Sequence, residues 1–323
     1  MAEQPNSDSH IHFLSVGTQN LLTDTMDQYV RTLGSIRTHF ASSMSSAMRF
    51  FQDGMVHILM MEVDLDDGSA YRLVKSLGGS TIDDSLYMVL ALEDETPELK
   101  ALAEEMEVHQ IVKKPFTAAD LKSLIDSYKV WRATPKDKWL TLIREAQFSA
   151  REKKFREAEK NFLEACKAAP LNPAPVYKSG LYYLTKPDYN MAEKLLKRAI
   201  EMKENYAAAI STLGSLYLVK GDLGKAEEYL VRAHSISPKN PDRAVEMTRL
   251  YIDRAMESCK NALRLDPSAV SARSMLGKLL AVQKDYVGAV RELERSLPDL
   301  RDAIRSEAQT FIALSRKLGS LAK

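Results

Sequence analysis

Four acidic side chains fall within the six positions 62–67, in the stretch EVDLDD that precedes Gly68. The apolar run HILMM (57–61) comes directly before them, as it does where a buried strand reaches the edge of a sheet. Carboxylates at a strand end can hold Mg²⁺ or accept a phosphoryl group, because both need oxygen atoms in a fixed arrangement. The stretch therefore indicates an acidic metal and phosphate site or the remains of one.

Alternating segments before residue 131 must position this stretch. Five strand-like runs are expected at 11–16, 35–40, 56–62, 87–92 and 109–114, with helices near 20–33, 42–54, 69–78, 96–106 and 117–131. Strands separated by helices of this length form right-handed crossovers and one sheet that is covered on both faces. The sequence predicts a small, doubly wound, five-stranded parallel sheet.

The chain changes character around WRATPKDKW (131–139), and no strand signal follows. From residue 139 it is helical and repeats every 34 residues, which aligns Ala158 with Ala192 and Ala226. One helix pair cannot bury the apolar stripe of such a repeat, so successive pairs must stack. We expect a first domain over 10–130, a linker over 131–138, and an all-α solenoid with a C-terminal capping helix over 139–323.

One repeat is defective. Pro238 and Pro267 are 29 residues apart, five fewer than the period, and the loss falls within 241–267, where a turn should join two helices. Either the two helices are fused into one, or turn residues are missing from the sequence. The pattern is compatible with both.

The second half resembles the tetratricopeptide repeat family over about 160 residues, on the 34-residue period and on the small residues Gly180, Gly214 and Gly277 of the first helices. The resemblance implies a concave groove that holds a peptide or a partner helix. The positions assigned to the groove are mostly apolar or small: Ile143, Gln147, Tyr177, Leu181, Leu184, Ser211, Ser215 and Leu218. Such a groove suits an amphipathic helix; the alternative is that some of these side chains only pack within the solenoid.

The first half resembles the receiver domain of bacterial response regulators, which has a flavodoxin-like fold. The resemblance rests on the five-fold alternation, on KKPF (113–116) after the fifth strand and on DDG after the third. Receivers hold Mg²⁺ with an acid pair after strand one, bind the phosphoryl group with a hydroxyl after strand four, and neutralise it with a lysine after strand five. Here Gly17 and Thr18 replace the acid pair, Ala91 replaces the hydroxyl residue, and only the lysine, Lys114, is kept.

The residue in the place of the phosphate-accepting aspartate depends on the register. The family pattern Asp-x-x-Leu-Pro-Asp-Gly overlays EVDLDDG with Glu62 at the acceptor position. A slip of two residues would place Asp64 there, but it would lengthen the strand and break the overlay. We take Glu62 as the acceptor equivalent, able to pair with Lys114, with Asp64 as the alternative.

Composition limits the other function classes. Lys plus Arg (45) balances Asp plus Glu (44), which disfavours binding to nucleic acid. Cys166 and Cys259 lie far apart and read as reduced thiols, and no secretion signal or membrane-spanning run is visible, so a cytoplasmic location is expected. His39 and His57 belong to different strands, and no order of Ser, His and Asp indicates a nucleophile.

These patterns predict a non-catalytic adaptor of bacterial two-component signalling, with no metal and no cofactor. The expected partners are proteins: a histidine kinase, a response regulator or a client peptide or helix, with a homodimer through the receiver-like domain as a further expectation. The alternative is a phosphorylation-dependent response regulator that uses Asp64 and has the solenoid as its output domain.

Overall fold

The computed structural model describes residues 10–18, 21–22, 24–52, 56–77 and 86–321. The predicted helix ends at 20, 53–54 and 78 lie outside the described residues. The chain forms two compact units, Met1–Leu213 with Arg232–Arg243, and Gly214–Val231 with Ala244–Lys323. No helix in the part of the chain that the structure describes has the length and apolarity to cross a bilayer.

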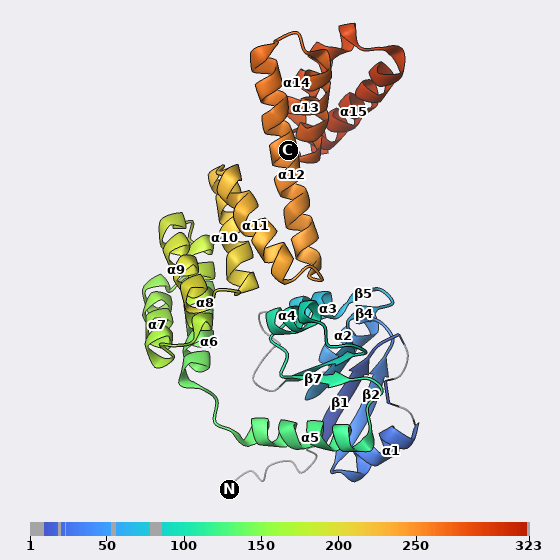
Figure 1. The fold of residues 1–323 in the computed structure, drawn as a ribbon, viewed down its shortest axis with the longest axis vertical. Helices are drawn as coiled ribbons and strands as arrows, with labels where there is room; N and C mark the ends of the chain where they lie inside the picture. The colour runs from blue at the N-terminus through green and yellow to red at the C-terminus, as the bar shows by residue number, and fades with distance from the viewer. Residues whose placement is uncertain (1–9, 19–20, 23, 53–55, 78–85, 322–323) are drawn as a thin grey trace. The chain divides into compact units, whose positions relative to one another are not determined.

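The first unit begins with a five-stranded sheet in the order β2-β1-β3-β6-β7, and all neighbouring strands are parallel (Figure 1). The strands are β1 (Ile11–Val16), β2 (Ile36–Ala41), β3 (Ile58–Glu62), β6 (Tyr87–Leu92) and β7 (Gln110–Lys113). The helices between and after them are α1 (Asp24–Thr32), α2 (Met44–Gln52), α3 (Ala70–Leu77), α4 (Pro97–Glu105) and α5 (Ala118–Ala133). The predicted doubly wound sheet is confirmed.

Successive side chains of each strand point to opposite faces of the sheet, so each face carries an apolar layer. Leu59 and Met61 of β3 join the core cluster that contains residues of α2, α3 and α4. Ile58 and Met60, which point to the opposite face, join the cluster with residues of α1 and α5. Because both faces of the central strands are covered, their sequences are continuously apolar.

A short antiparallel hairpin, β4 (Asp64–Leu65) with β5 (Gly68–Ser69), follows β3 and was not predicted. Its turn residue Asp67 accepts hydrogen bonds from the backbone N–H groups of Met44 at 2.5 Å and Ser45 at 3.0 Å. A carboxylate in this position satisfies donors that the first turn of α2 leaves open. This acid of the EVDLDDG stretch therefore caps a helix.

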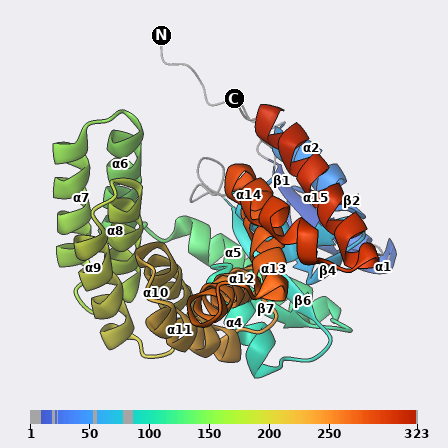
Figure 2. The same cartoon turned by 90° about the horizontal axis from the view of Figure 1, so that it is seen from above.

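Antiparallel helix pairs follow α5. In the first unit these are α6 (Lys138–Arg151) with α7 (Phe155–Ala168) and α8 (Pro173–Thr185) with α9 (Tyr189–Met202), which lie side by side in Figure 2. Helices α10 (Ala207–Lys220) and α11 (Leu223–Ile236) contribute residues to both units. Helix α6 begins at Lys138, the last residue of the expected linker.

The defective repeat forms one helix, α12 (Pro241–Leu265), and Figure 1 shows it as an unbroken ribbon. No glycine or proline interrupts residues 242–265, so nothing stops the helix once the turn residues are lost. The fused-helix alternative is the one that the structure shows.

The second unit ends with α13 (Val270–Val282), α14 (Tyr286–Ser296) and α15 (Asp302–Leu321). Ala308 and Ile312 of α15 pack with Leu293 of α14 in a buried cluster. The last helix thus covers apolar surface of the preceding pair.

Candidate functional site

The carboxyl ends of the parallel strands bring three of the predicted site residues together. Thr18 follows β1, Glu62 is the last residue of β3, and Lys114 follows β7. This edge, where the strand order reverses between β1 and β3, is where doubly wound sheets bind ligands.

The Glu62 carboxylate lies between the other two residues. Its Oε1 lies 2.6 Å from Lys114 Nζ, while Oε2 accepts the backbone N–H of Thr18 at 2.9 Å and the Thr18 hydroxyl at 3.3 Å. The side chains of Glu62 and Lys114 are only 15% and 24% exposed, so water screens their pair weakly. Burial alone lowers the pKa of Lys114, but its hydrogen bond and charge interaction with Glu62 outweigh burial and raise it.

Gly17 lies directly against this carboxylate. A Cβ atom built on Gly17 would lie 2.5 Å from Glu62 Oε2 and 2.9 Å from its Cδ. The Glu62 side chain thus fills the space that any larger residue at position 17 would need.

Ala91 and Asp64 take no part in this contact. Ala91 is buried directly beside Glu62 in the β3–β6 register, and its methyl group has no hydrogen to donate. Asp64 is exposed and opens the β4–β5 hairpin.

The residues at this edge do not fit Mg²⁺. The ion needs one or two carboxylates that are free to coordinate, together with phosphate and water. The Glu62 carboxylate is held by Lys114 and Thr18, and in the described ranges no group of three or more His, Cys, Asp or Glu side chains could hold a metal ion. The edge still lines a cavity of about 580 Å³ with Asp64, Glu93 and Lys114 among its walls.

The predicted groove residues of the first unit have different surroundings. Ile143 is buried in the core cluster of α6 and α7, and Gln147 is exposed. Tyr177 packs edge-on against Tyr206 with ring centroids 5.2 Å apart, and Ser211 is buried.

The remaining groove positions are Leu181 and Leu184, which are half-buried, and two residues of the second unit. There Ser215 donates a hydrogen bond to Glu246 at 3.2 Å, and Leu218 is buried.

Sequence reasoning missed the polar and charged residues around Tyr177 and Ser211. Lys178 is the chain neighbour of Tyr177, and Asn240 and Arg243 stand at the start of α12, in the repeat whose spacing is irregular. Their signal in the sequence was the polar run KNPDR (239–243), which the groove assignment did not include.

The sheet also joins histidines that belong to different strands. Because β1 lies between β2 and β3, His12 stacks on His39 with ring centroids 5.2 Å apart and on His57 at 5.8 Å. Burial, followed by nearby positive groups including Arg37, lowers the pKa values of His12 and His39. The three stacked imidazole rings include no carboxylate and no nucleophile. We therefore interpret the stack as a structural feature of the sheet, in which His12 and His39 have lowered pKa values.

Models of the tetratricopeptide repeat match residues 207–240 and 252–308. A search of curated proteins finds no match. Among solved structures, the chain is similar to the signal receiver domain of an HD domain-containing protein from Pseudomonas fluorescens Pf-5, at 17% identity and a TM-score of 0.35, covering 41% of this chain and 96% of that one.

Two further structures are response regulators. The chemotaxis response regulator CheY4 of Vibrio cholerae is 14% identical, with a TM-score of 0.32, covering 37% of this chain and 99% of that one. A receiver domain protein from Methanospirillum hungatei JF-1 is 12% identical, with a TM-score of 0.34, covering 38% and 98%. Residues 207–240 and 252–308 are thus tetratricopeptide repeats, and the N-terminal part of the chain is similar to receiver domains.

Proposed function

We propose that this protein is a non-catalytic adaptor of two-component-like signalling that works without phosphorylation of its receiver-like half. Tetratricopeptide repeats support a role in binding proteins. The receiver-like half would dock a histidine kinase, a response regulator or a second copy of the chain, and the repeats would hold a client, in the cytoplasm. The division into 10–130, 131–138 and 139–323 is part of this proposal.

The observation that carries the proposal is the position of the Glu62 carboxylate. It pairs with Lys114 and accepts the Thr18 N–H. These are the groups that an added phosphoryl group would need for charge neutralisation and hydrogen bonding. We therefore assign Glu62 as the acceptor equivalent, whose carboxylate occupies these groups whether or not a kinase is present.

The alternative, phosphorylation at Asp64 with the repeats as output, has less support. Asp64 is exposed, and Lys114 pairs with Glu62 at 2.6 Å. A phosphoryl group on Asp64 would have to compete with the Glu62 carboxylate for that lysine, and the two negative groups would repel each other.

Intact-mass measurement distinguishes the proposed adaptor from a regulator that is phosphorylated at Asp64. Purified full-length protein is incubated with Mg²⁺ and acetyl phosphate and then weighed intact, beside an Asp64→Asn variant. We expect no phosphoryl adduct in either protein. A stoichiometric acid-labile adduct on the wild type that disappears in Asp64→Asn would establish the alternative.

A further inference from the structure

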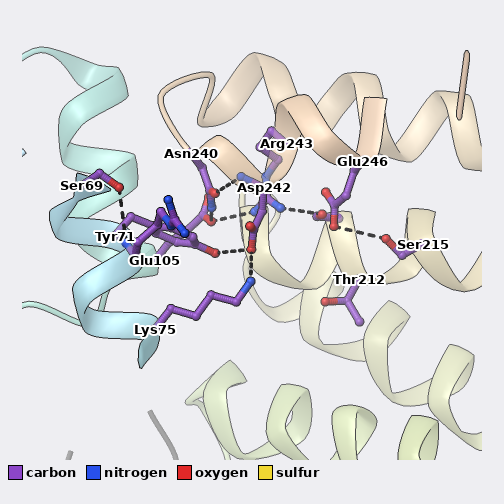
Figure 3. Close-up of polar contacts among 12 residues, drawn as sticks. Ser69, Tyr71, Lys75, Glu105, Thr212, Ser215, Asn240, Asp242, Arg243 and Glu246 are labelled. Atoms are coloured by element: carbon purple, nitrogen blue, oxygen red, sulfur yellow. Dashed lines mark hydrogen bonds and ion pairs between the residues drawn. The ribbon is translucent and has the colours of Figure 1, made fainter. Parts of the chain in front are cut away.

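The C-terminal end of α4 carries three acids, Glu104, Glu105 and Glu107, which we call the acidic end of α4. Within the first unit, all three contact the helical repeats. Figure 3 shows the central one, Glu105, facing Asn240 and Arg243 at the start of α12.

Glu105 and Arg243 form a buried ion pair. Arg243 Nη2 lies 2.7 Å from Glu105 Oε2, and the two side chains are 7% and 5% exposed, Glu105 and Arg243 respectively. Asn240 also donates to Glu105 Oε2, and Arg243 Nη1 donates to Ser211 at 2.5 Å. Charges with so little water around them are retained only with a partner, so Arg243 requires an anion at this place.

The flanking acids are matched in the same way. Glu107 pairs with Lys178 of α8 at 2.8 Å, and Glu104 pairs with Lys203, which follows α9. Each acid thus meets a base from a different part of the repeats: Lys178 in α8, Lys203 just after α9 and Arg243 in α12.

Tyr206 completes this face of the repeats. Burial, followed by neighbouring Tyr177 and glutamates that include Glu107, raises the pKa of Tyr206. The face that consists of Lys178, Lys203, Tyr206, Ser211, Asn240 and Arg243 is basic and partly aromatic, and we call it the basic repeat face.

A second contact has the opposite polarity. Asp242 of α12 accepts a hydrogen bond from the Tyr71 hydroxyl at 2.9 Å and pairs with Lys75 of α3 (Figure 3). The side chains of Lys75 and Asp242 are 61% and 37% exposed, so this ion pair contributes little to stability. It helps to align α3 with the start of α12.

We propose that the basic repeat face is a binding site for an acidic helix end, and that the acidic end of α4 is its ligand within the same chain. The partner that fits is a protein helix that ends in two consecutive glutamates with a third acid two residues further on, as in the sequence AEEME (103–107). Such a partner must displace α4, whose tether gives it a high effective concentration. The proposal rests on the proposed function only in treating the repeats as protein-binding, and it does not depend on Glu62.

The test uses the full-length chain and a fluorescent, helix-constrained peptide with the sequence of residues 97–108, PELKALAEEMEV. Constraint is needed because a free peptide of this length is a marginal helix. In Glu105→Lys, repulsion from Arg243 should release α4 and leave the basic repeat face intact. By anisotropy we expect the peptide to bind this variant at least about tenfold more tightly than wild type.

Variants with reversed charges test whether the peptide binds at the basic repeat face. Arg243→Glu also releases α4 but should lose the peptide, while a peptide with lysines in place of Glu104 and Glu105 should bind this variant. Glu105→Lys combined with Arg243→Glu restores an ion pair and should bind neither peptide. Asp126→Lys, the same charge change at an exposed position of α5, should behave as wild type.

Hydrogen–deuterium exchange of the same proteins reports the resident contact. Residues 97–105 and 240–243 should exchange faster in each single variant and regain protection in the double variant. Unchanged exchange of the buried strand β3 (Ile58–Glu62) in each single variant shows that it folds. Equal peptide affinity for wild type and Glu105→Lys, or unchanged exchange of residues 97–105 and 240–243 in both singles, would overturn the proposal. Neither result bears on phosphorylation, which the acetyl phosphate experiment tests separately.

Discussion

The acids of EVDLDDG have separate structural tasks. Glu62 joins the ends of β1, β3 and β7 through Thr18 and Lys114, and Asp67 caps α2. Hydrogen bonds from Ser45 are the main cause of the lowered pKa of Asp67, so it stays charged in the folded protein. A cluster that has the composition of a metal site is therefore divided between an ion pair and a helix cap.

The Glu62–Lys114 pair should be measurable by a double-mutant cycle. We expect Lys114→Met to lower the free energy of unfolding by about 1–3 kcal/mol, because it leaves the largely buried Glu62 carboxylate with Thr18 alone. Glu62→Gln keeps the shape and should cost less. The coupling free energy from urea unfolding should be about 1 kcal/mol; a value near zero would show that the pair does not contribute to stability.

The histidine stack predicts a pH dependence. Because the pKa values of His12 and His39 are lowered in the folded protein, the unfolded chain binds more protons below about pH 6.5. Their contribution is complete above that pH and is lost as the pH falls through the folded-state pKa. The melting temperature should drop between pH 7 and pH 5, and His12→Gln with His39→Gln should flatten this slope.

A matched variant checks this assignment. Gln147→Asn, at an exposed position of α6 and without a titratable group, should leave the slope as in wild type. If the double variant keeps the full slope, other groups cause it.

At the scale of elements, glycines let paired helices approach closely. A Cβ atom at Gly180 would lie 3.2 Å from Leu196, whereas at Gly214 it would lie 2.7 Å from Leu230 and at Gly277 2.6 Å from Leu293. In each case the leucine belongs to the second helix of the same repeat, so one sequence column sets the approach of each pair.

The destabilisation caused by alanine at these three glycines should therefore be larger where the distance from the added Cβ atom to the leucine is shorter. Alanine gains about 1 kcal/mol of helix propensity over glycine. We expect Gly214→Ala and Gly277→Ala to lose more than this to overpacking, by about 1–3 kcal/mol, and Gly180→Ala to lose least. Thermal unfolding measures the order. The control is Gly224→Ala in α11, where the added Cβ atom would lie 3.7 Å from Asp222 Oδ1, an ordinary contact distance, and the change should be neutral or stabilising.

At the scale of the whole molecule, a buried charge pair links the receiver-like sheet to the repeats inside the first unit. Glu105 and Arg243 are 138 residues apart in the chain. Removing one partner of such a pair is costly, because the other charge remains buried.

Calorimetry should detect this link. Arg243→Met is expected to destabilise the first unit by about 3–5 kcal/mol and to split a shared unfolding transition into separate ones for the sheet and the repeats. Lys203→Met removes a partner of the exposed Glu104 and should change little. A single transition in Arg243→Met, at the wild-type temperature, would contradict a coupling role for the pair.

The sequence by itself determined the elements and the repeat columns. Apolar periodicity is a local property, so it located the strands, the helices, Gly180, Gly214 and Gly277, and the strand end at Glu62. The resemblance to receiver domains, and not periodicity, singled out Lys114 after the fifth strand; parallel strands then carry it to the same edge as the acidic stretch.

Only the tertiary structure decided which distant residues meet. It joined Glu105 to Arg243, stacked His12 on His39, and resolved residues 241–265 as one helix. A pattern of residue types specifies which face of an element is apolar, but a polar contact depends on the packing of whole elements. The charge of Glu105 reads as an ordinary solvated glutamate in the sequence, and burial against the repeats makes it require Arg243.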